Sequence, residues 1–262
     1  TATEKTRVAG SVTDTTMREK TSRFTPQASH FVATNVRERG MEAFHGRTMR
    51  REGPPRREHR RGTTMTMSRD QVVVAADTLA RAMIDEPSSR WLLPDPDEFR
   101  TVHRELYEAL IRLALDEGRV DTWGEPTVGV AVWLVRPPIS EVGAPAERGK
   151  RRLPAAFPAH ATERLERYSA VIRRLRERVR PERHAYLDTM AVLPEHRRRG
   201  IASRLLEAGH AWADAAGLAC ALDTETAQNV TFYEHRGYRT VARLRVPGSD
   251  LTVSGMRRRR VA

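Results

Sequence analysis

The sequence contains one cysteine, Cys220, among its 262 residues. A single cysteine excludes a disulfide framework. It also leaves too few sulfur ligands for a structural zinc site, and the nine histidines include no His-x-x-x-His pair. We therefore expect no bound metal. A Gly-x-Ser-x-Gly turn is missing as well, which argues against a serine hydrolase of the α/β type.

Long apolar runs are also missing. No stretch approaches the roughly 20 consecutive apolar residues that cross a bilayer, and the mean hydropathy is −0.60. The sequence shows no basic start followed by an apolar run, which is the pattern of a secretory signal. These absences predict a protein without a membrane partner, and they make the cytoplasm the expected compartment.

The net charge of +12 is concentrated at the two ends of the chain. Residues 1–66 hold 14 Lys and Arg against 7 Asp and Glu, and Arg257 to Arg260 add four positive charges. A net charge of about +1 is left for residues 67–256. A basic surface on a folded domain is therefore not indicated, and we expect no nucleic-acid partner.

Composition and periodicity divide the chain into three parts. Residues 1–66 show no sustained apolar period of either 2 or 3.6 residues, which predicts a largely disordered basic extension. We expect this extension to be dispensable, because it has too few apolar residues to repay its ordering entropy. A single domain is predicted over residues 67–257, and residues 258–262 form a basic tail.

The periodicity of the domain changes from helical to alternating. Helices are predicted at residues 71–86 and 97–118, strands at 120–123 and 128–134, and a third, amphipathic helix at 162–179. A strand follows at 186–192, then a basic glycine turn at 197–200 and a helix at 201–216. The last elements are a strand at 218–224, a short helix at 229–235 and a strand at 238–246. Alternating strands and helices predict an α/β layer with ligands at strand ends near helix starts.

The glycine turn, Arg197-Arg198-Arg199-Gly200-Ile201-Ala202, has the properties of an anion site. Gly200 permits a tight backbone turn, and the small Ala202 permits close approach of a ligand. The free N–H groups of the first helical turn add the positive end of the helix dipole. The turn lacks the Lys-Ser/Thr ending of an ATP-binding P-loop and the three glycines of a dinucleotide fingerprint. ATP and NAD are therefore disfavoured.

Three segments resemble the GNAT superfamily of N-acetyltransferases. Residues 186–194, the turn HRRRGIASRLLE from His196, and residues 229–238 are similar, in this order, to the acetyl-CoA motif and the N-x-x-F-Y-x-x-x-G-Y/F motif of that family. The resemblance covers 185–257 well and 71–184 loosely. It implies the GNAT fold, an α/β fold in which helices flank a central, mixed and twisted sheet.

The resemblance implies acetyl-CoA as the cosubstrate and no metal. The amides of residues 198–203 would hold the CoA pyrophosphate, the edge of the strand at 190–192 would pair with the pantetheine arm, and Asn229 would meet the arm from the other side. The residues assigned to the cofactor in this way are Met190, Ala191, Val192, Arg197, Arg198, Arg199, Gly200, Ile201, Ala202, Ser203, Asn229 and Tyr233.

Tyr233 matches the family's tyrosine near the CoA sulfur, where a phenol of pKa about 10 could protonate the departing thiolate. Simple core packing of Phe232 and Tyr233 is the alternative. The attacking amine must also lose a proton, because an alkylamine is mostly protonated at neutral pH. The candidate proton acceptors, which the sequence does not separate, are Asp188, Asp223, Glu225 and His184.

Within the superfamily, Tyr186 to Thr189, Leu222 to Thr224 and Met256-Arg257 resemble the puromycin N-acetyltransferase branch, although Asp223 stands where that branch commonly has Glu. The resemblance implies acetyl transfer to a primary amine of a small, antibiotic-like acceptor by direct attack on the thioester. We expect a monomer or homodimer. Two alternatives stay open, an acetyltransferase that acts on a protein amine and a non-catalytic regulator that binds acyl-CoA.

Overall fold

The structure is a computed structural model that describes residues 67–138, 157–179 and 182–260. The predicted extension 1–66 and most of the loop 137–158 lie outside the described residues. The helices are α1 (Arg69–Met83), α2 (Pro87–Leu92), α3 (Pro96–Glu117), α4 (Thr162–Val179), α5 (Ile201–Ala215) and α6 (Ala227–Glu234). The strands are β1 (Gly118–Trp123), β2 (Gly129–Arg136), β3 (His184–Val192), β4 (Ala219–Thr224), β5 (Arg239–Arg245) and β6 (Thr252–Arg258).

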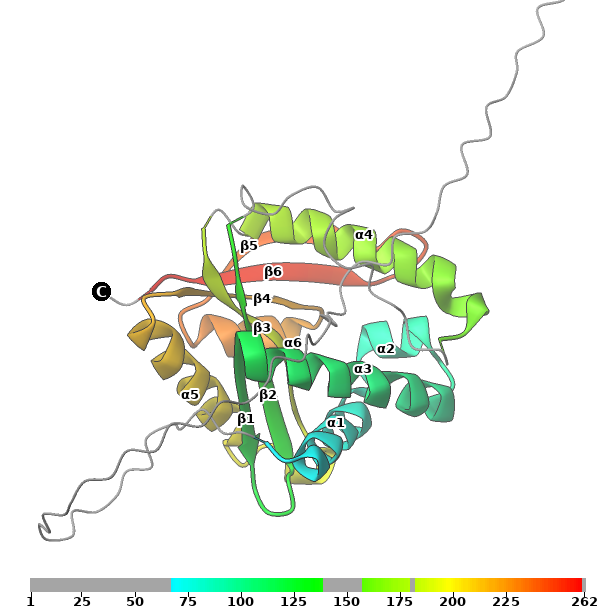
Figure 1. The fold of residues 1–262 in the computed structure, drawn as a ribbon. Coiled ribbons are helices and arrows are strands. Elements are labelled where there is room, and N and C mark those ends of the chain that lie inside the picture. The colour runs from blue at the N-terminus through cyan, green and yellow to red at the C-terminus, as the bar shows by residue number, and fades with distance from the viewer. Residues whose placement is uncertain (1–66, 139–156, 180–181, 261–262) are drawn as a thin grey trace, which may run out of the picture.

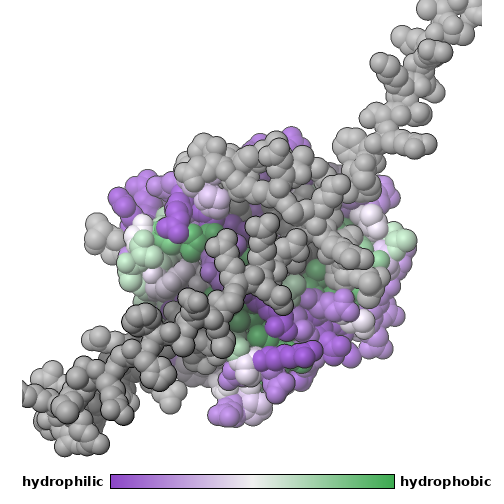
Figure 2. All heavy atoms as spheres, in the orientation of Figure 1, coloured by the Kyte–Doolittle hydropathy of each residue, from purple (hydrophilic) through white to green (hydrophobic). Residues whose placement is uncertain are grey.

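The strands form one mixed sheet in the order β1-β2-β3-β4-β6-β5, in which only the central pair β3 and β4 is parallel among the described strands. Helices α1 to α4 cover one face, and α5 and α6 cover the other (Figure 1). The visible outer surfaces of the helices are mainly hydrophilic (Figure 2), as expected of amphipathic helices that bury their apolar stripe against a sheet. This arrangement confirms the predicted α/β layer.

The two central strands separate after a short run of pairing. Strand β3 pairs with β4 only from His184 to Leu187, opposite Ala219 to Leu222. Beyond that point β3 continues to Val192 beside β2, and β4 continues to Thr224 beside β6. The edge of β3 that faces β4 therefore offers unpaired backbone groups from Asp188 onward, at the carboxyl ends of two parallel strands.

Helix α5 lies unusually close to the sheet at Gly209. A β-carbon added to Gly209 would come within 2.2 Å of the indole of Trp133, which is fully buried on β2. Glycine is required here for this close approach. The contact fixes the axis of α5, and with it the position of the turn at its amino end.

Two elements differ from the sequence-based prediction. Strand β6 was not predicted, and it lies between β4 and β5 in the sheet. Its central Gly255 weakens the strand pattern, but a β-carbon there would come within 2.6 Å of Val179 on α4. Helix α2 was also missed, because Pro87 was interpreted as the end of a helix when it is the first residue of the next one.

No helix in the described part of the chain is both long enough and apolar enough to span a bilayer.

Candidate functional site

A cavity of about 180 Å³ opens where β3 and β4 separate. Residues of β3, β4 and α6 line one side of it, and residues of α2, α3 and α4 line the other. Five predicted residues meet there: Asp188, Met190, Asp223, Asn229 and Tyr233. Glu225, the remaining carboxylate candidate, lines the cavity as well, whereas His184 does not.

Helix α6 presents Asn229 and Tyr233 to the cavity. The hydroxyl of Thr226 caps this helix by accepting a hydrogen bond from the backbone N–H of Asn229 at 3.1 Å. The Tyr233 ring packs edge to face against Phe232 and Tyr238, with centroids 5.2 and 5.6 Å away. Burial raises the pKa of Tyr233 above its ordinary value, so the phenol stays protonated at neutral pH and carries a proton that it can donate.

The turn before α5 has the backbone of an anion site. Gly200 is the N-cap at φ 78°, and no side chain caps the helix. Arg198 also has a positive φ, 63°, which is uncommon for a residue with a side chain. The first-turn amides of α5 have no intrahelical acceptor. They are left to a ligand or to solvent, and the predicted role of this turn in anion binding stays a prediction.

Side chains around this turn hold it in place. Arg197 donates to the carbonyl oxygens of Val192, at 3.1 Å, and Ala82, at 2.9 Å. Arg236, from just beyond α6, donates to the hydroxyl of Ser203 at 2.5 Å. The guanidinium of Arg197 thus ties the turn to β3 and α1, and this contact supports a positioning role rather than direct contact of its side chain with a phosphate.

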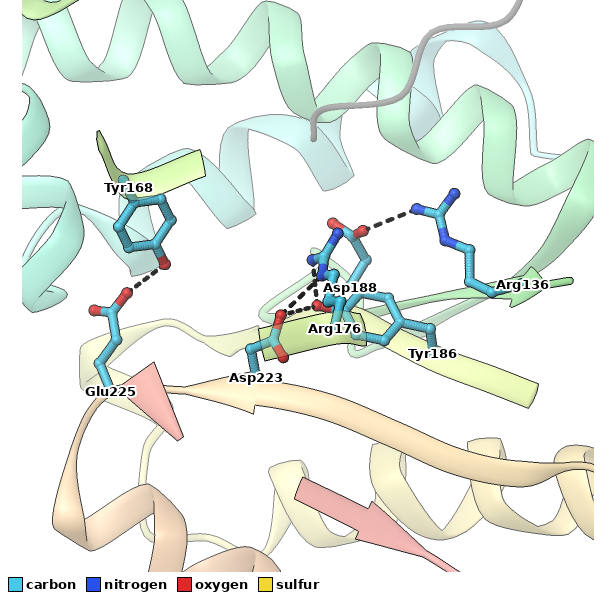
Figure 3. A network of polar contacts seen from close by, with 7 residues as sticks. All are labelled: Arg136, Tyr168, Arg176, Tyr186, Asp188, Asp223 and Glu225. Carbon is cyan, nitrogen blue, oxygen red and sulfur yellow. Dashed lines mark hydrogen bonds and ion pairs between the residues drawn. The ribbon is translucent and has the colours of Figure 1, made fainter. Parts of the chain in front are cut away.

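Asp223 belongs to a buried polar cluster on the cavity wall (Figure 3). Its Oδ2 accepts hydrogen bonds from Nε of Arg176 at 2.9 Å and from the hydroxyl of Tyr186 at 2.5 Å. Arg176 also donates to the Tyr186 hydroxyl and lies 4.2 Å from the ring centroid. The side chains of Arg176 and Asp223 are 10% and 8% exposed. The cluster joins α4 to β3 and β4, so it braces the point where the strands separate.

Asp188 has a cationic partner too. Its Oδ2 lies 3.5 Å from Nη2 of Arg136, and both side chains are mostly buried. Both aspartates among the catalytic candidates, Asp188 and Asp223, are therefore ion-paired.

Two glutamates, Glu86 and Glu225, line the cavity. Glu225 follows β4 and accepts hydrogen bonds from the hydroxyl of Tyr168 at 2.6 Å and from the backbone N–H of Ser88 at 2.9 Å (Figure 3). Glu86 is the N-cap residue of α2, and its side chain makes no capping hydrogen bond. Burial, and then repulsion by Glu225, raises the pKa of Glu86 above its ordinary value.

Sequence reasoning missed Glu86. The only local signal was its place directly before Pro87, where a helix N-cap is expected, and this signal concerns structure rather than chemistry. Within the described ranges, no group of three His, Cys, Asp or Glu side chains is arranged to hold a metal ion.

Comparison with known proteins agrees with this geometry. Residues 165–240 match the sequence model of the acetyltransferase (GNAT) domain. The matched segment runs from α4 into β5, so it includes the separating strands, the glycine turn and α6. Residues 165–240 are therefore similar to a GNAT acetyltransferase domain.

Solved structures of low identity share the fold. Arylalkylamine N-acetyltransferase 2 of Aedes aegypti is 13% identical, with a TM-score of 0.54 over 74% of this chain and 96% of its own. An insect protein described as arylalkylamine N-acetyltransferase 7, from the same mosquito, is 16% identical, with a TM-score of 0.53 over 73% of this chain and 84% of its own. At such identities the likeness shows the GNAT fold alone. The resemblance to the puromycin N-acetyltransferase branch stays a prediction.

Replacement of Asp223 with Ala should lower the free energy of unfolding by about 3–5 kcal/mol, because Arg176 would be left buried without its counter-charge. Urea unfolding would measure the change. Asp250→Ala is the matched control, since it removes an aspartate paired with Arg245 on the open surface and should leave the urea midpoint unchanged. Equal midpoints for the two variants would show that the buried cluster does not brace the strands.

Proposed function

We propose that the protein transfers an acetyl group from acetyl-CoA to a primary amine of a small molecule. The observation that carries this proposal is the gap between β3 and β4. It leads from the free edge of β3 into a cavity lined by Asn229, Tyr233 and unpaired acidic side chains. The family match supports acetyl transfer, and the shape of the cavity supports a small acceptor.

The residues along the gap fit acetyl-CoA, whose thioester supplies the activated acetyl group. The free amides of residues 198–203 suit the pyrophosphate, since a helix N-terminus favours an anion. The unpaired edge of β3 from Met190 to Val192 suits the amide groups of the pantetheine arm, and Asn229 lies on the opposite side of the gap. Tyr233 stands one helical turn beyond Asn229 on the same face of α6, at the reacting end.

The reaction needs two proton movements that this site supports. The acceptor nitrogen must lose a proton before it attacks the thioester carbonyl, and the departing thiolate must gain one. Tyr233 is the protonated donor on the thiolate side. The acidic side chains of the cavity supply the acceptor for the amine proton, which favours an enzyme over a non-catalytic regulator that binds acyl-CoA.

The helices that line the cavity favour a small acceptor over a protein. Helices α2, α3 and α4 contribute Leu92, His103 and Leu165 to the wall opposite the sheet. A protein amine would need an open groove for the chain on either side of the modified residue. Acetylation of a protein amine is therefore the second candidate function.

An amine screen tests the function. Thiol release from acetyl-CoA would be followed with puromycin, an aminoglycoside, 2-phenylethylamine and a lysine peptide as acceptors. Release with at least one small amine, and slower release with the peptide, is the expected result. Acetylation of the peptide alone would favour the protein-amine alternative. Tight acetyl-CoA binding with no release for any amine would favour the regulator.

Gly200→Ala should weaken acetyl-CoA binding at least tenfold, because a methyl group would stand where the pyrophosphate must approach the backbone. Gly217→Ala is the matched control. Both glycines have a positive φ, 78° and 66°, and an added β-carbon meets no protein atom within 4 Å at either position. Calorimetric titration with acetyl-CoA should separate the two variants. Equal affinities would place the phosphate site elsewhere.

Tyr233→Phe should lower kcat by about 10- to 1,000-fold with little change in the KM for acetyl-CoA, because it removes only the proton donor. The raised pKa of Tyr233 keeps the phenol protonated, so the defect should be constant from pH 6 to 9. Tyr238→Phe is the control, since its hydroxyl contacts His210 at 3.0 Å and does not line the cavity. A kcat within twofold of the parent for Tyr233→Phe would end the donor assignment.

A further inference from the structure

The cavity carries more negative than positive charge. Four carboxylates line it, and the arginine that lines it is Arg176. Arg176 is paired with Asp223, and Asp188 is paired with Arg136. Glu86 and Glu225 are the other two carboxylates. Among the described residues, no cationic side chain lies within 4.0 Å of either carboxylate. A ligand that brings a positive charge would compensate these two side chains.

Glu225 is held in a fixed position. One oxygen accepts the hydrogen bond from Tyr168 on α4 and the other accepts the hydrogen bond from the Ser88 amide on α2. These contacts join three elements at the carboxylate, so its place on the cavity wall does not depend on a flexible side chain. Each oxygen keeps a further lone pair for a ligand.

Glu86 differs from Glu225 in its surroundings. No described residue donates a hydrogen bond to its side chain, although it is mostly buried and lines the cavity. The charged and titratable groups near it are Glu225 beyond β4, Arg197 in the glycine turn, Asp85 beside it, Tyr107 on α3 and Tyr233 on α6. Burial outweighs Arg197 and raises the pKa of Glu86, which brings this carboxylate closer in basicity to an amine.

We propose that Glu86 and Glu225 together bind the ammonium group of the acceptor, and that Glu86 then accepts its proton. This inference rests on the proposed function and names the acceptor class: a primary amine with a single positive charge on an uncharged, apolar or aromatic body. Glu225 is held by its hydrogen bonds, and Glu86 lies close enough to Glu225 and Tyr233 to influence both electrostatically, so the bound nitrogen would lie near Tyr233.

The proton transfer balances in two steps. The ammonium N–H bond breaks, its proton forms an O–H bond with Glu86, and the nitrogen lone pair attacks the thioester carbonyl carbon. The tetrahedral intermediate collapses as its C–S bond breaks, and Tyr233 protonates the thiolate. Glu86 then releases its proton to solvent. The second proton that the nitrogen loses passes through solvent to the Tyr233 phenolate and restores the phenol. The net products are the N-acetyl amine, CoA thiol and one proton.

The remaining wall mixes apolar side chains with hydroxyl groups such as those of Ser169 and Thr224. Leu92, Leu165 and Ile172 are apolar, and Tyr107 adds an aromatic surface. His103 is stacked on Phe99 at 3.7 Å, and burial lowers the pKa of His103 to about 4, so it is uncharged at neutral pH. An acceptor with its own carboxylate would meet the two glutamates without a free cation to offset the repulsion.

The test compares Glu86→Gln with the parent, using 2-phenylethylamine and acetyl-CoA. At pH 7 the kcat/KM for the amine should fall by about 10- to 1,000-fold, as expected for loss of a general base. The acetyl-CoA affinity should be unchanged. The defect should shrink as pH rises toward 9.5, because the amine then loses its proton to solvent without Glu86. A defect of equal size at pH 7 and pH 9.5 would mean a structural role and would overturn the proposal.

Two controls make the result specific. Asp85→Asn removes an exposed carboxylate next to Glu86 in the chain and should keep kcat/KM within twofold. Glu86→Asp keeps the carboxylate and should recover part of the activity lost in Glu86→Gln. A parent-like rate for Glu86→Gln at pH 7, or an equal loss in Asp85→Asn, would contradict the assignment.

A binding measurement separates this inference from the proposed function. If the parent protein released no thiol with any amine, the proposed function would be contradicted. Calorimetric titration of the parent with an amine in the presence of CoA would still test whether Glu86 and Glu225 bind an ammonium group. Binding of 2-phenylethylamine should exceed that of the uncharged 2-phenylethanol at least tenfold, and Glu86→Gln should remove most of this preference. Equal binding of the two compounds by the parent would overturn the inference.

Discussion

The short parallel pairing of β3 and β4 is the constraint on which the site depends. Four residues of each strand pair, and then the strands follow their other neighbours, β2 and β6. An unpaired backbone in a protein interior must find a partner. Under the proposed function, the free edge of β3 would pair with an extended ligand that carries amide groups, between the glycine turn at the end of β3 and the cavity that α6 lines.

The separation of the strands must itself be held open. Arg176 on α4 reaches Tyr186 on β3 and Asp223 on β4, so one buried cation contacts both strands near the last paired residues. Gly255 on β6 allows α4 to approach closely enough for this contact. A buried ion pair contributes little net stability, but it requires one particular geometry. Asp223, one of the acidic candidates from the sequence, is therefore part of the contact that holds the two strands apart.

The sequence predicted those features that depend on neighbouring residues. The boundaries of α4 and α5, the hairpin of β1 and β2, and the glycine turn follow from periodicity and from residues such as Gly200. Strand β6 was missed because Gly255 is required by the close approach of Val179, which is 76 positions away in the sequence. Glu86 was missed for the same reason, since its role is defined by Glu225 and Tyr233 on distant elements. Chemistry that arises from tertiary packing leaves no local pattern.

Charge has an opposite sign at the two ends of the gap. The glycine turn begins with three consecutive arginines and lies beside Arg236, whereas the cavity is lined by Glu86 and Glu225, of which Glu86 is also influenced by Arg197 of the turn. In the proposed reaction, such a field would favour one orientation of acetyl-CoA, with its phosphates at the turn and its neutral thioester toward the cavity. It would also attract a cationic acceptor to the cavity rather than to the turn. Under that proposal, charge sorts the two substrates to opposite sides of the point where β3 and β4 part.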